Sequence, residues 1–274
     1  MKLIPGFTMT PFSQIIWLSL EAKQRWEKPI QACTQMVQEL ELLSVEHDHR
    51  PCAWQTMNRA SLPEFARNCA ERGMVVLPVK FVGSFGGFIH YTPSGDESVY
   101  CIISKSLKNA LRFRDCFEKG DHVGQGEMLG FPSCCCSFFE QNWKAGYFDP
   151  IWQIGDRDNP HPLSNPLLRY VGLRVGFHIP HSFNCQYTVA AAIERLSLAK
   201  DKGVVKILES LLSMPMSWDA YKGQAIIKTP IFYFINYTVP TLERYRIGLP
   251  GTFIPREAVH GNCFPLKGAS CAAS

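Results

Sequence analysis

The sequence predicts an α+β fold, with helices packed on a small antiparallel sheet in a single compact domain. Three observations favour this class. Several segments carry apolar residues at helical spacing, the β-rich runs are short and separated by Gly or Pro, and no repeat or low-complexity linker divides the chain. The 274 residues, 46% of them hydrophobic, are enough to form a stable core without disulfide bonds or metal ions to support it. We therefore expect one globular domain over residues 1–274.

Helical patterns occur three times in the first 119 residues. Residues 12–46 have apolar side chains at helical spacing, and Pro29 is expected to break or kink this stretch into two helices. Residues 61–64, Ser-Leu-Pro-Glu, match a capping box that opens a short helix, which Gly73 should end. Residues 104–119 also have a helical pattern.

Strand-like runs lie between these helices and again near the C-terminus. Those between the helices cover residues 74–82, 87–91 and 98–103. Pro78 cannot donate a backbone hydrogen bond, so the first run should lie at a sheet edge or contain a bulge. Residues 224–239 are also β-rich, with a break at Pro230. Short runs separated by Gly and Pro are typical of antiparallel strands.

The second half of the chain mixes turns with short helices. Residues 120–130 are rich in turn residues and lead to a helix that should begin near Pro132. Residues 147–166 contain many Asp, Pro and Asn, which predicts a long loop. Two further helices are expected, over residues 188–199 and 204–212. A subdivision near residue 120 would separate a helical and β-rich part, 1–119, from a Cys/His-containing part, 120–274.

Composition and charge argue against several classes of protein. The formal net charge is +4, from 28 Lys and Arg against 24 Asp and Glu, and no basic run has the density of a nucleic-acid-binding patch. Charged or polar residues interrupt every apolar run before about 18 residues, so we expect no membrane span. The first residues lack the apolar core and cleavage site of a signal peptide, which predicts a cytoplasmic protein with reduced thiols.

Three adjacent cysteines, Cys134-Cys135-Cys136, are the strongest local signal for chemistry. The chain has 11 cysteines, an odd number that argues against a complete disulfide framework, and a cluster of reduced thiols indicates a metal site or a catalytic site. Free cysteines also pack like small hydrophobic residues, so one or two of the three could belong to the core. Because neighbours on a helix differ by about 100°, at least one must point elsewhere.

A second candidate segment, residues 178–185, has the sequence His-Ile-Pro-His-Ser-Phe-Asn-Cys. If the fold brings it to the adjacent cysteines, the thiolates and imidazoles would form a soft ligand set that suits zinc, iron or an iron–sulfur cluster. The alternative is that these are ordinary core residues. The predicted metal ligands are Cys134, Cys135, His178, His181 and Cys185, with an iron–sulfur cluster preferred over mononuclear iron or zinc.

Three further residues are candidates for catalysis. Glu127 lies just before the adjacent cysteines and could serve as acid, base or ligand, although most Glu side chains are simply exposed. Arg169, like Arg174, could hold an anionic substrate, or pair with an acidic residue. Cys136, the third of the adjacent cysteines, completes the set of catalytic candidates.

Residues 130–135, Gly-Phe-Pro-Ser-Cys-Cys, are followed by two Phe residues and resemble a motif of an uncharacterised microbial and phage family. That family pairs Gly-Tyr/Phe-Pro-x-Cys-Cys with a later His-x-Pro-Cys-Ser-x-x-Cys. Here the second motif corresponds to residues 178–185, with His181 where the family has Cys. The resemblance covers residues 120–190 and implies no assigned activity. The change at position 181 replaces one soft ligand with another possible one.

Three functions are compatible with these residues. The first is a metal-dependent enzyme of unknown substrate, in which Cys and His residues hold the metal and Glu127 and an arginine act on the substrate. The second is a metal-free enzyme with a cysteine nucleophile, activated by His178 or His181. Cys134 would be closest to the helix start, where a thiolate is favoured. The third is a binding or assembly protein with a structural zinc site, which four protein ligands without a substrate cleft would favour.

Overall fold

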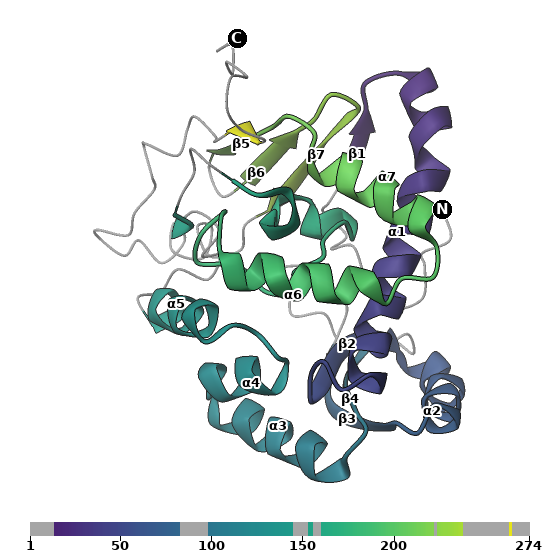
Figure 1. The fold of residues 1–274 in the computed structure, drawn as a ribbon, viewed down its shortest axis with the longest axis vertical. Helices are drawn as coiled ribbons and strands as arrows, with labels where there is room; N and C mark the ends of the chain where they lie inside the picture. The colour runs from purple at the N-terminus through teal and green to yellow at the C-terminus, as the bar shows by residue number, and fades with distance from the viewer. Residues whose placement is uncertain are drawn as a thin grey trace.

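Two antiparallel sheets and seven α-helices make up the part of the chain that this computed structural model describes (Figure 1). The described residues are 14–82, 98–144, 153–155, 160–221, 224–237 and 263–264. This architecture confirms the predicted α+β class, with two sheets in place of the single sheet expected. The subdivision near residue 120 stays a prediction. Among the described helices, none combines the length and the apolar character needed to cross a membrane.

The smaller sheet has three strands in the order β2-β4-β3, all antiparallel. They are β2 (Cys52–Asn58), β3 (Val75–Val82) and β4 (Ser98–Ser104). Successive side chains of β4 point to opposite faces, so Ile103 packs on the side of helix α2 (Leu62–Glu71) and Ile102 on the side of helix α3 (Leu107–Lys119). Helices therefore cover both faces of this sheet.

The larger sheet has five antiparallel strands in the order β1-β7-β6-β5-β8. They are β1 (Gln14–Trp17), β5 (Met216–Tyr221), β6 (Gln224–Lys228), β7 (Phe232–Tyr237) and β8 (Cys263–Phe264). Phe232 and Phe234 of β7 are fully buried in the largest cluster of apolar side chains, which we call the main core. Leu208 and Leu212 of helix α7 (Lys202–Leu212) belong to the same cluster. β6 and β7 confirm the predicted β-rich segment and its break at Pro230.

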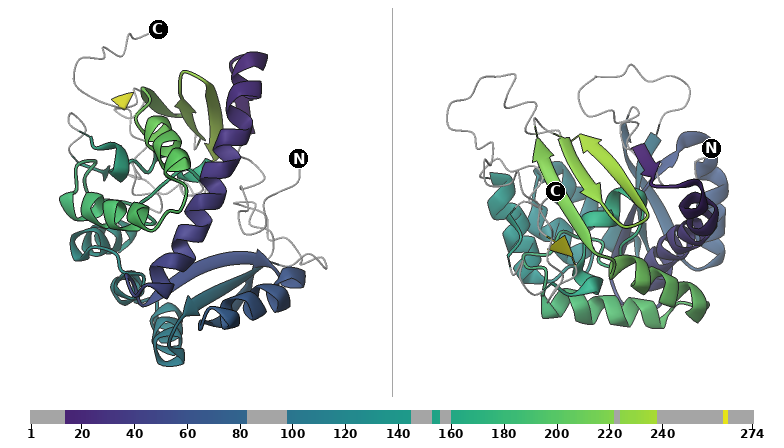
Figure 2. Two further views of the ribbon diagram at one scale, coloured as in Figure 1. Left: turned by 45° about the vertical axis from the view of Figure 1, so that its right-hand side comes forward. Right: turned by 90° about the horizontal axis from the view of Figure 1, so that it is seen from above.

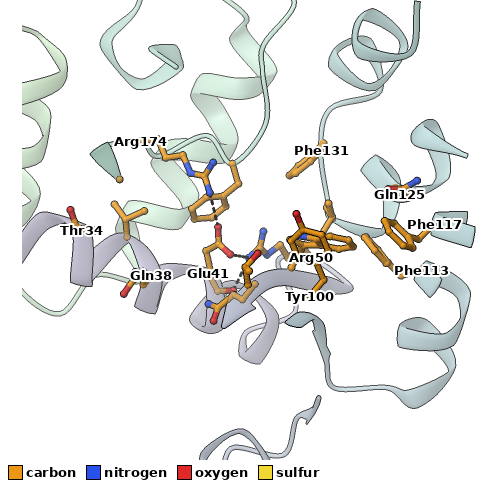
Figure 3. Close-up of a pocket in the computed structure, with 17 residues that line it drawn as sticks. Thr34, Gln38, Glu41, Arg50, Tyr100, Phe113, Phe117, Gln125, Phe131 and Arg174 are labelled. Atoms are coloured by element: carbon orange, nitrogen blue, oxygen red, sulfur yellow. Dashed lines mark hydrogen bonds and ion pairs between the residues drawn. The ribbon is translucent and has the colours of Figure 1, made fainter. Parts of the chain in front are cut away.

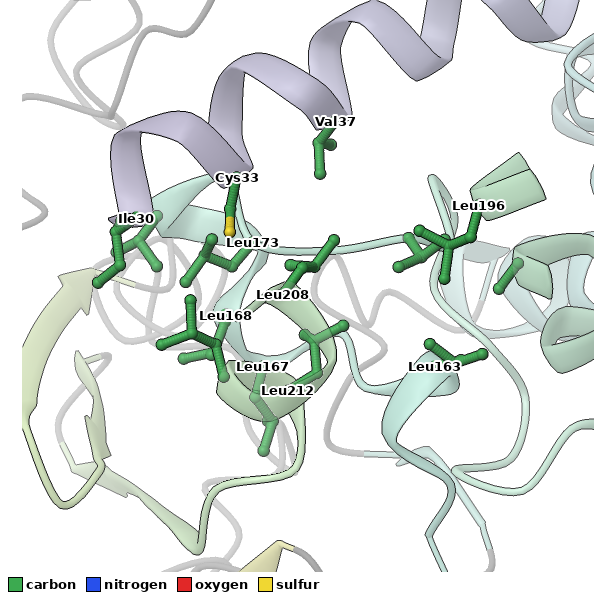
Figure 4. Close-up of a cluster of buried hydrophobic side chains, with 14 of the residues drawn as sticks. Ile30, Cys33, Val37, Leu163, Leu167, Leu168, Leu173, Leu196, Leu208 and Leu212 are labelled. Carbon is green, nitrogen blue, oxygen red and sulfur yellow. The ribbon is translucent and has the colours of Figure 1, made fainter. Parts of the chain in front are cut away.

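One long helix, α1 (Leu20–Glu46), connects the region of the larger sheet with the region of the smaller sheet, as the left view of Figure 2 shows. Ile30, Cys33 and Val37 belong to the main core (Figure 4). Leu42 and Val45, further along the same helix, pack in the core of the smaller sheet. The helix therefore fixes the position of one region relative to the other.

The prediction that Pro29 divides residues 12–46 into two helices is wrong. α1 is continuous through Pro29, and the residues before the helix form β1. A proline inside a helix costs roughly 3 kcal/mol through a lost hydrogen bond and a steric clash. Trp26 and Ile30, on either side of Pro29, pack against the same core, and this tertiary contact outweighs the local preference.

Two other local predictions are corrected. Ser61 has a helical backbone and makes no capping bond, because a short 3-10 helix, η1 (Arg59–Ser61), precedes α2 and is capped by Asn58. Residues 120–130, expected to be turns, contain helix α4 (His122–Met128), whose first turn is capped by the Asp121 carboxylate. Its two glycines weaken the helical pattern and hide the helix in the sequence.

The strand predictions for residues 74–82 and 98–103 are confirmed by β3 and β4. β3 is an edge strand, and its register shifts between Pro78 and Lys80, as the proline requires. The run at 87–91 lies outside the described residues. β2 forms the other edge of this sheet and was not predicted.

The remaining helices hold the Cys/His segments. α5 (Ser133–Lys144) begins after Pro132 as predicted, and α6 (Gln186–Ser197) begins after Cys185. α6 and α7 confirm the two helices expected in this part of the chain. Between α5 and α6, the described residues include two short 3-10 helices, η3 (Pro162–Ser164) and η4 (Leu167–Val171).

Candidate metal centre

Four sulfur and nitrogen atoms from two separate segments converge at the start of α5. The residues are Cys134, Cys135, His181 and Cys185, which we call the Cys/His group, and their ligand atoms all lie within 4.8 Å of one another. The first two come from the first turn of α5, and the other two come from the loop that leads into α6. The fold therefore brings the two Cys/His segments together, and this group could hold a metal ion.

The spacing within the Cys/His group is close to that of ligands around one ion. The Sγ atom of Cys134 lies 3.9 Å from the Sγ atoms of both Cys135 and Cys185, and the last two are 3.7 Å apart. Cys135 Sγ lies 3.5 Å from His181 Nδ1. At a zinc–sulfur distance of about 2.3 Å, a tetrahedral ion separates its thiolates by roughly 3.8 Å. These four separations match a tetrahedral site, and the remaining two are at most 4.8 Å.

Helix geometry separates Cys136 from its two neighbours. The backbone N–H groups of Cys135 and Cys136 both donate to the carbonyl of Pro132, at 2.9 and 3.0 Å, which begins the helix at this point. One further step of about 100° turns the Cys136 thiol away from the group. It lies 3.7 Å from the Phe131 carbonyl and against Gly126, where a Cβ atom would collide with it.

Backbone hydrogen bonds hold the loop that carries His181 and Cys185. Gly155 donates to the carbonyl of His181 at 3.0 Å, and Phe183 donates back to the Gly155 carbonyl at 2.9 Å. The Phe183 side chain is buried in the main core. His181 and Cys185 are therefore held by the short segment that joins them, which is anchored at Phe183. Cys185 is the N-cap residue of α6.

Thr188, one turn into α6, connects the Cys/His group to His178. Its Oγ1 atom lies 3.6 Å from Cys135 Sγ and 2.8 Å from Nε2 of His178. With Nε2 protonated, His178 donates to Thr188, whose own hydroxyl proton can then be donated to the sulfur. The structure thus leaves His178 outside the group and gives it a supporting position, with its ring 5.0 Å from that of Phe131.

Burial and hydrogen bonds act on the titration of these residues. Burial raises the pKa of the Cys134 and Cys135 thiols. Burial also acts to raise the pKa of Cys185, but hydrogen bonds from Thr188 and the neighbouring thiols lower it overall. Burial, together with the nearby Arg195 and Arg174, lowers the pKa of His178 to about 3, so its imidazole is neutral at pH 7.

A cavity of about 340 Å³ lies beside the Cys/His group and opens toward solvent. Cys135, Cys136 and His178 form part of its wall, and Arg169 and Arg174 contribute positive charge. Arg169 also donates from Nη1 to the Pro166 carbonyl at 3.2 Å. A small ligand in this cavity would therefore lie close to a metal held by the group.

The three catalytic candidates lie in different surroundings. Cys136 and Arg169 line the cavity, at its wall. Glu127 lies on α4 with an exposed side chain, 4.0 Å from Arg112, and it acts on Cys136 by raising the pKa of that thiol together with burial. The catalytic roles of all three stay predictions.

Sequence reasoning missed Thr188 and the clustering of Arg174 with Arg50 and Arg195. Thr188 has a signal in the sequence, because it follows Cys185 by three residues and so shares a helix face with it once α6 is assigned. The arginines Arg50, Arg174 and Arg195 are far apart in the chain and carry no common motif. Comparison with protein-family models, curated proteins and solved structures finds no match.

Proposed function

We propose that the Cys/His group holds one tetrahedral metal ion and that zinc is its natural occupant. The observation that carries this proposal is the convergence of three thiols and one imidazole within 4.8 Å, with the three sulfur atoms 3.7–3.9 Å apart. Cys₃His is one of the standard ligand sets of structural zinc sites. Two of the three thiols, those of Cys135 and Cys185, are almost completely buried, which protects them from other ligands.

This spacing favours a single ion over the iron–sulfur cluster that the sequence suggested. In a cubane cluster each thiolate binds a different iron, so the sulfur atoms lie farther apart than around one ion. The Cys/His group would have to expand to hold such a cluster. Mononuclear iron has the same geometric fit as zinc, and the metal content decides between them.

The position of the site supports a structural role for the ion. Its ligands are 46 to 51 positions apart and join the start of α5 to the start of α6. An ion at this point would tie α5, whose first turn forms part of the wall of the adjacent cavity, to the segment that follows the wall residues His178 and Ile179. Because an unfolded chain has no such site, the binding free energy of the metal would also stabilise the fold.

A metal-dependent enzyme is the second candidate function. It is favoured by the cavity, whose wall includes Cys135 of the group as well as Cys136 and Arg169. An anionic substrate there would contact Arg169 and lie next to the ion. Four protein ligands leave no open coordination position, so this function requires one ligand to leave the ion.

A metal-free cysteine nucleophile has less support. Cys134, the thiol nearest to the start of α5, has a raised pKa because of burial, whereas a nucleophile needs a lowered one. Cys136 has a pKa of about 11 for the same reason. Neither environment stabilises a thiolate at neutral pH, and Cys185, whose pKa is lowered, is 3% exposed and does not line the cavity.

Metal analysis of protein purified without oxygen tests the proposal, with Cys135→Ala and Cys136→Ala as matched variants. We expect a colourless protein with one zinc per chain, which Cys135→Ala loses and Cys136→Ala keeps, because only the first thiol belongs to the group. Cobalt substitution should give the visible spectrum of tetrahedral thiolate coordination.

Two results would count against a single zinc ion. A brown protein whose absorbance at roughly 400 nm is lost in Cys135→Ala would establish an iron–sulfur cluster. Protein without bound metal, or equal metal content in both variants, would leave the group as a set of packed thiols.

A further inference from the structure

A second cavity, of about 500 Å³, lies between α1, the smaller sheet and α3 (Figure 3). Its volume is within the range of sites for small molecules, about 300–1,000 Å³. No residue of the Cys/His group lines it. It shares five wall residues with the smaller cavity, Gln125, Leu129, Phe131, Arg174 and Phe177, so the two are neighbours.

One end of this cavity carries an excess of positive charge. The guanidinium carbons of Arg50, Arg174 and Arg195 lie 4.8, 5.5 and 4.7 Å from the ring centre of Phe177. Glu41 is the buried carboxylate beside them, at 3.6 Å from Arg50 and 3.5 Å from Arg174 (Figure 3). Glu194, which also acts on Arg195, has a side chain that is 60% exposed.

This excess is costly without a further anion. Three buried or half-buried cations face one buried carboxylate, and an uncompensated charge in the interior is strongly unfavourable. Burial lowers the pKa of Arg50, and it lowers that of Arg195 to about 9 with a further contribution from Arg50. A bound anion would remove this repulsion.

Two donors on the cavity wall lack a partner in the described structure. They are Nε of Arg50, whose side chain is 2% exposed, and Nε2 of Gln38. A buried donor without an acceptor costs about 1–3 kcal/mol. Both donors would be satisfied by the oxygen atoms of a carboxylate or a phosphate, the groups that guanidinium binds best.

The other end of the cavity is aromatic. Phe113 and Phe117 lie together there, and Tyr100 lies beside Arg50 (Figure 3). The ring of Trp54, which also lines the cavity, is 4.9 Å from that of Tyr100 and 5.2 Å from those of Phe113 and Phe117. Rings at such distances form walls against which a flat ligand ring can stack. Gln125 adds an amide for hydrogen bonding.

We propose that this cavity binds a small molecule that carries both an anionic group and a flat aromatic ring. The anionic group would contact Arg50 and Arg174 beside Glu41, and the ring would lie against the wall that Trp54 and Tyr100 form. Nucleoside monophosphates and aromatic carboxylates share this chemistry. The proposal does not depend on a metal in the Cys/His group, because no ligand residue lines the cavity.

Calorimetric titration of the full-length protein tests this proposal. The probes are the four common ribonucleoside monophosphates, and benzoate and anthranilate as aromatic carboxylates. Adenosine, benzamide and inorganic phosphate each lack one half of the proposed ligand. We expect at least one complete probe to bind at least roughly 10-fold more tightly than its incomplete counterparts, since charge-assisted hydrogen bonds are worth about 1.5–3 kcal/mol. Which class binds identifies the source of the anionic group.

Variants place the binding in this cavity. Arg174→Gln and Gln38→Leu should each weaken the best probe, by about 10-fold for the first. Arg114→Gln is the matched control, because Arg114 is an exposed residue of α3 that pairs with Glu118 outside the cavity. Since the Gln38 amide nitrogen has no partner to lose, Gln38→Leu remains informative even if Arg174→Gln fails to fold.

Three results would overturn the proposal. The first is no binding by either class at millimolar concentration. The second is equal affinity for complete and incomplete probes. The third is wild-type affinity in the folded Gln38→Leu and Arg174→Gln variants.

Discussion

Buried cysteines occupy two contrasting environments in this protein. Four of them, which we call the core thiols, lie among apolar side chains of the two cores and are at most 1% exposed: Cys33, Cys52, Cys69 and Cys101. Cys135 and Cys185 of the Cys/His group are also nearly buried, at 2% and 3%, but their sulfur atoms face other ligand atoms. The nine cysteines whose side chains are described are all free of disulfides.

The comparison teaches that burial does not identify a ligand. A core thiol behaves as a small hydrophobic residue, and its surroundings hold it in the neutral form. In the Cys/His group, four atoms that can donate electron pairs lie within 4.8 Å of one another, and only such convergence gives a site for an ion. The predictions below test this difference, beginning with the largest effect.

The largest effect should come from removing one thiol of the Cys/His group. Cys135→Ala should abolish tight metal binding and lower the free energy of unfolding by several kcal/mol, because binding free energies of about 10–16 kcal/mol are available from structural zinc. Cys101→Ala, which removes an equally buried core thiol, should keep the metal. Denaturant unfolding in the presence of zinc, with metal analysis of each variant, measures both quantities. Similar losses for both variants would mean that the Cys/His group is simply part of the core.

A second large effect should appear at alkaline pH and should come from the core thiols. Burial raises the pKa of Cys33 to about 12 and those of Cys52, Cys69 and Cys101 to about 11, from an ordinary value of 9.0. The folded state therefore favours the neutral thiol, and this stabilisation is complete below pH 9 and is lost as the pH rises toward 11 and 12. Each thiol contributes a slope of about 1.4 kcal/mol per pH unit in that window.

Unfolding by urea between pH 8 and pH 11, in the presence of a reductant, measures this slope. In Cys101→Ala, the free energy of unfolding should fall less steeply with pH, by the contribution of one thiol. This difference distinguishes the titration of the core thiols from that of tyrosine and lysine. A free energy of unfolding that does not change across this range would show that the core thiols are in contact with water.

A smaller effect should come from Thr188, which contacts the Cys/His group without belonging to it. Thr188→Val keeps the shape of the side chain and removes the hydroxyl that lies 3.6 Å from Cys135 Sγ and 2.8 Å from His178 Nε2. Loss of such an outer-sphere hydrogen bond typically weakens metal affinity by about 10–100-fold. Competition with a chromogenic chelator measures the affinity. Thr34→Val is the matched control, because the Thr34 hydroxyl donates to the Ile30 carbonyl within α1. The metal affinity of this variant should equal that of the wild type.

Much of the fold could be predicted because its signals are local. The patterns of β3, β4, α5 and α7 lie within single segments, and Pro78 predicts an edge position or a bulge, of which β3 has both. The failures occur where distant contacts decide. α1 passes through Pro29 because the main core packs against both sides of it, and β2 forms because its partner β4 supplies the apolar neighbours. Neither contact is visible in the segment itself.

The candidate site could be predicted in part for the same reason. Cys134, Cys135, His181 and Cys185 were identified by residue type and clustering, and the fold brings them together. His178 has the same residue type as His181 but faces Thr188, a difference of side-chain direction that three positions along an irregular loop do not determine. The arginine cluster around Phe177 arises from three elements that no pattern connects.

The smallest effect should distinguish two core thiols from each other. Cys52 and Cys101 lie on neighbouring strands, but Cys52 is the cross-strand partner of Ser104, whereas Cys101 packs with Met57 and Val99. Serine at either position buries a hydroxyl group. At position 52 the hydroxyl can bond with Ser104, while at position 101 it lies among apolar side chains. Cys101→Ser should therefore lower the free energy of unfolding by about 1 kcal/mol more than Cys52→Ser.

Chemical denaturation of the two serine variants beside the two alanine variants measures this difference. Alanine removes the sulfur atom without adding a polar group, so Cys52→Ala and Cys101→Ala should cost similar amounts, about 1 kcal/mol each. If the two serine variants are equally stable, polar neighbours do not distinguish these thiols, and the environments of buried cysteines in this protein differ only at the Cys/His group. If Cys101→Ser is less stable than Cys52→Ser, as expected, the environments of the buried cysteines form a series from apolar to ligand-like. The position of each thiol in this series is then set by how many polar atoms its sulfur faces.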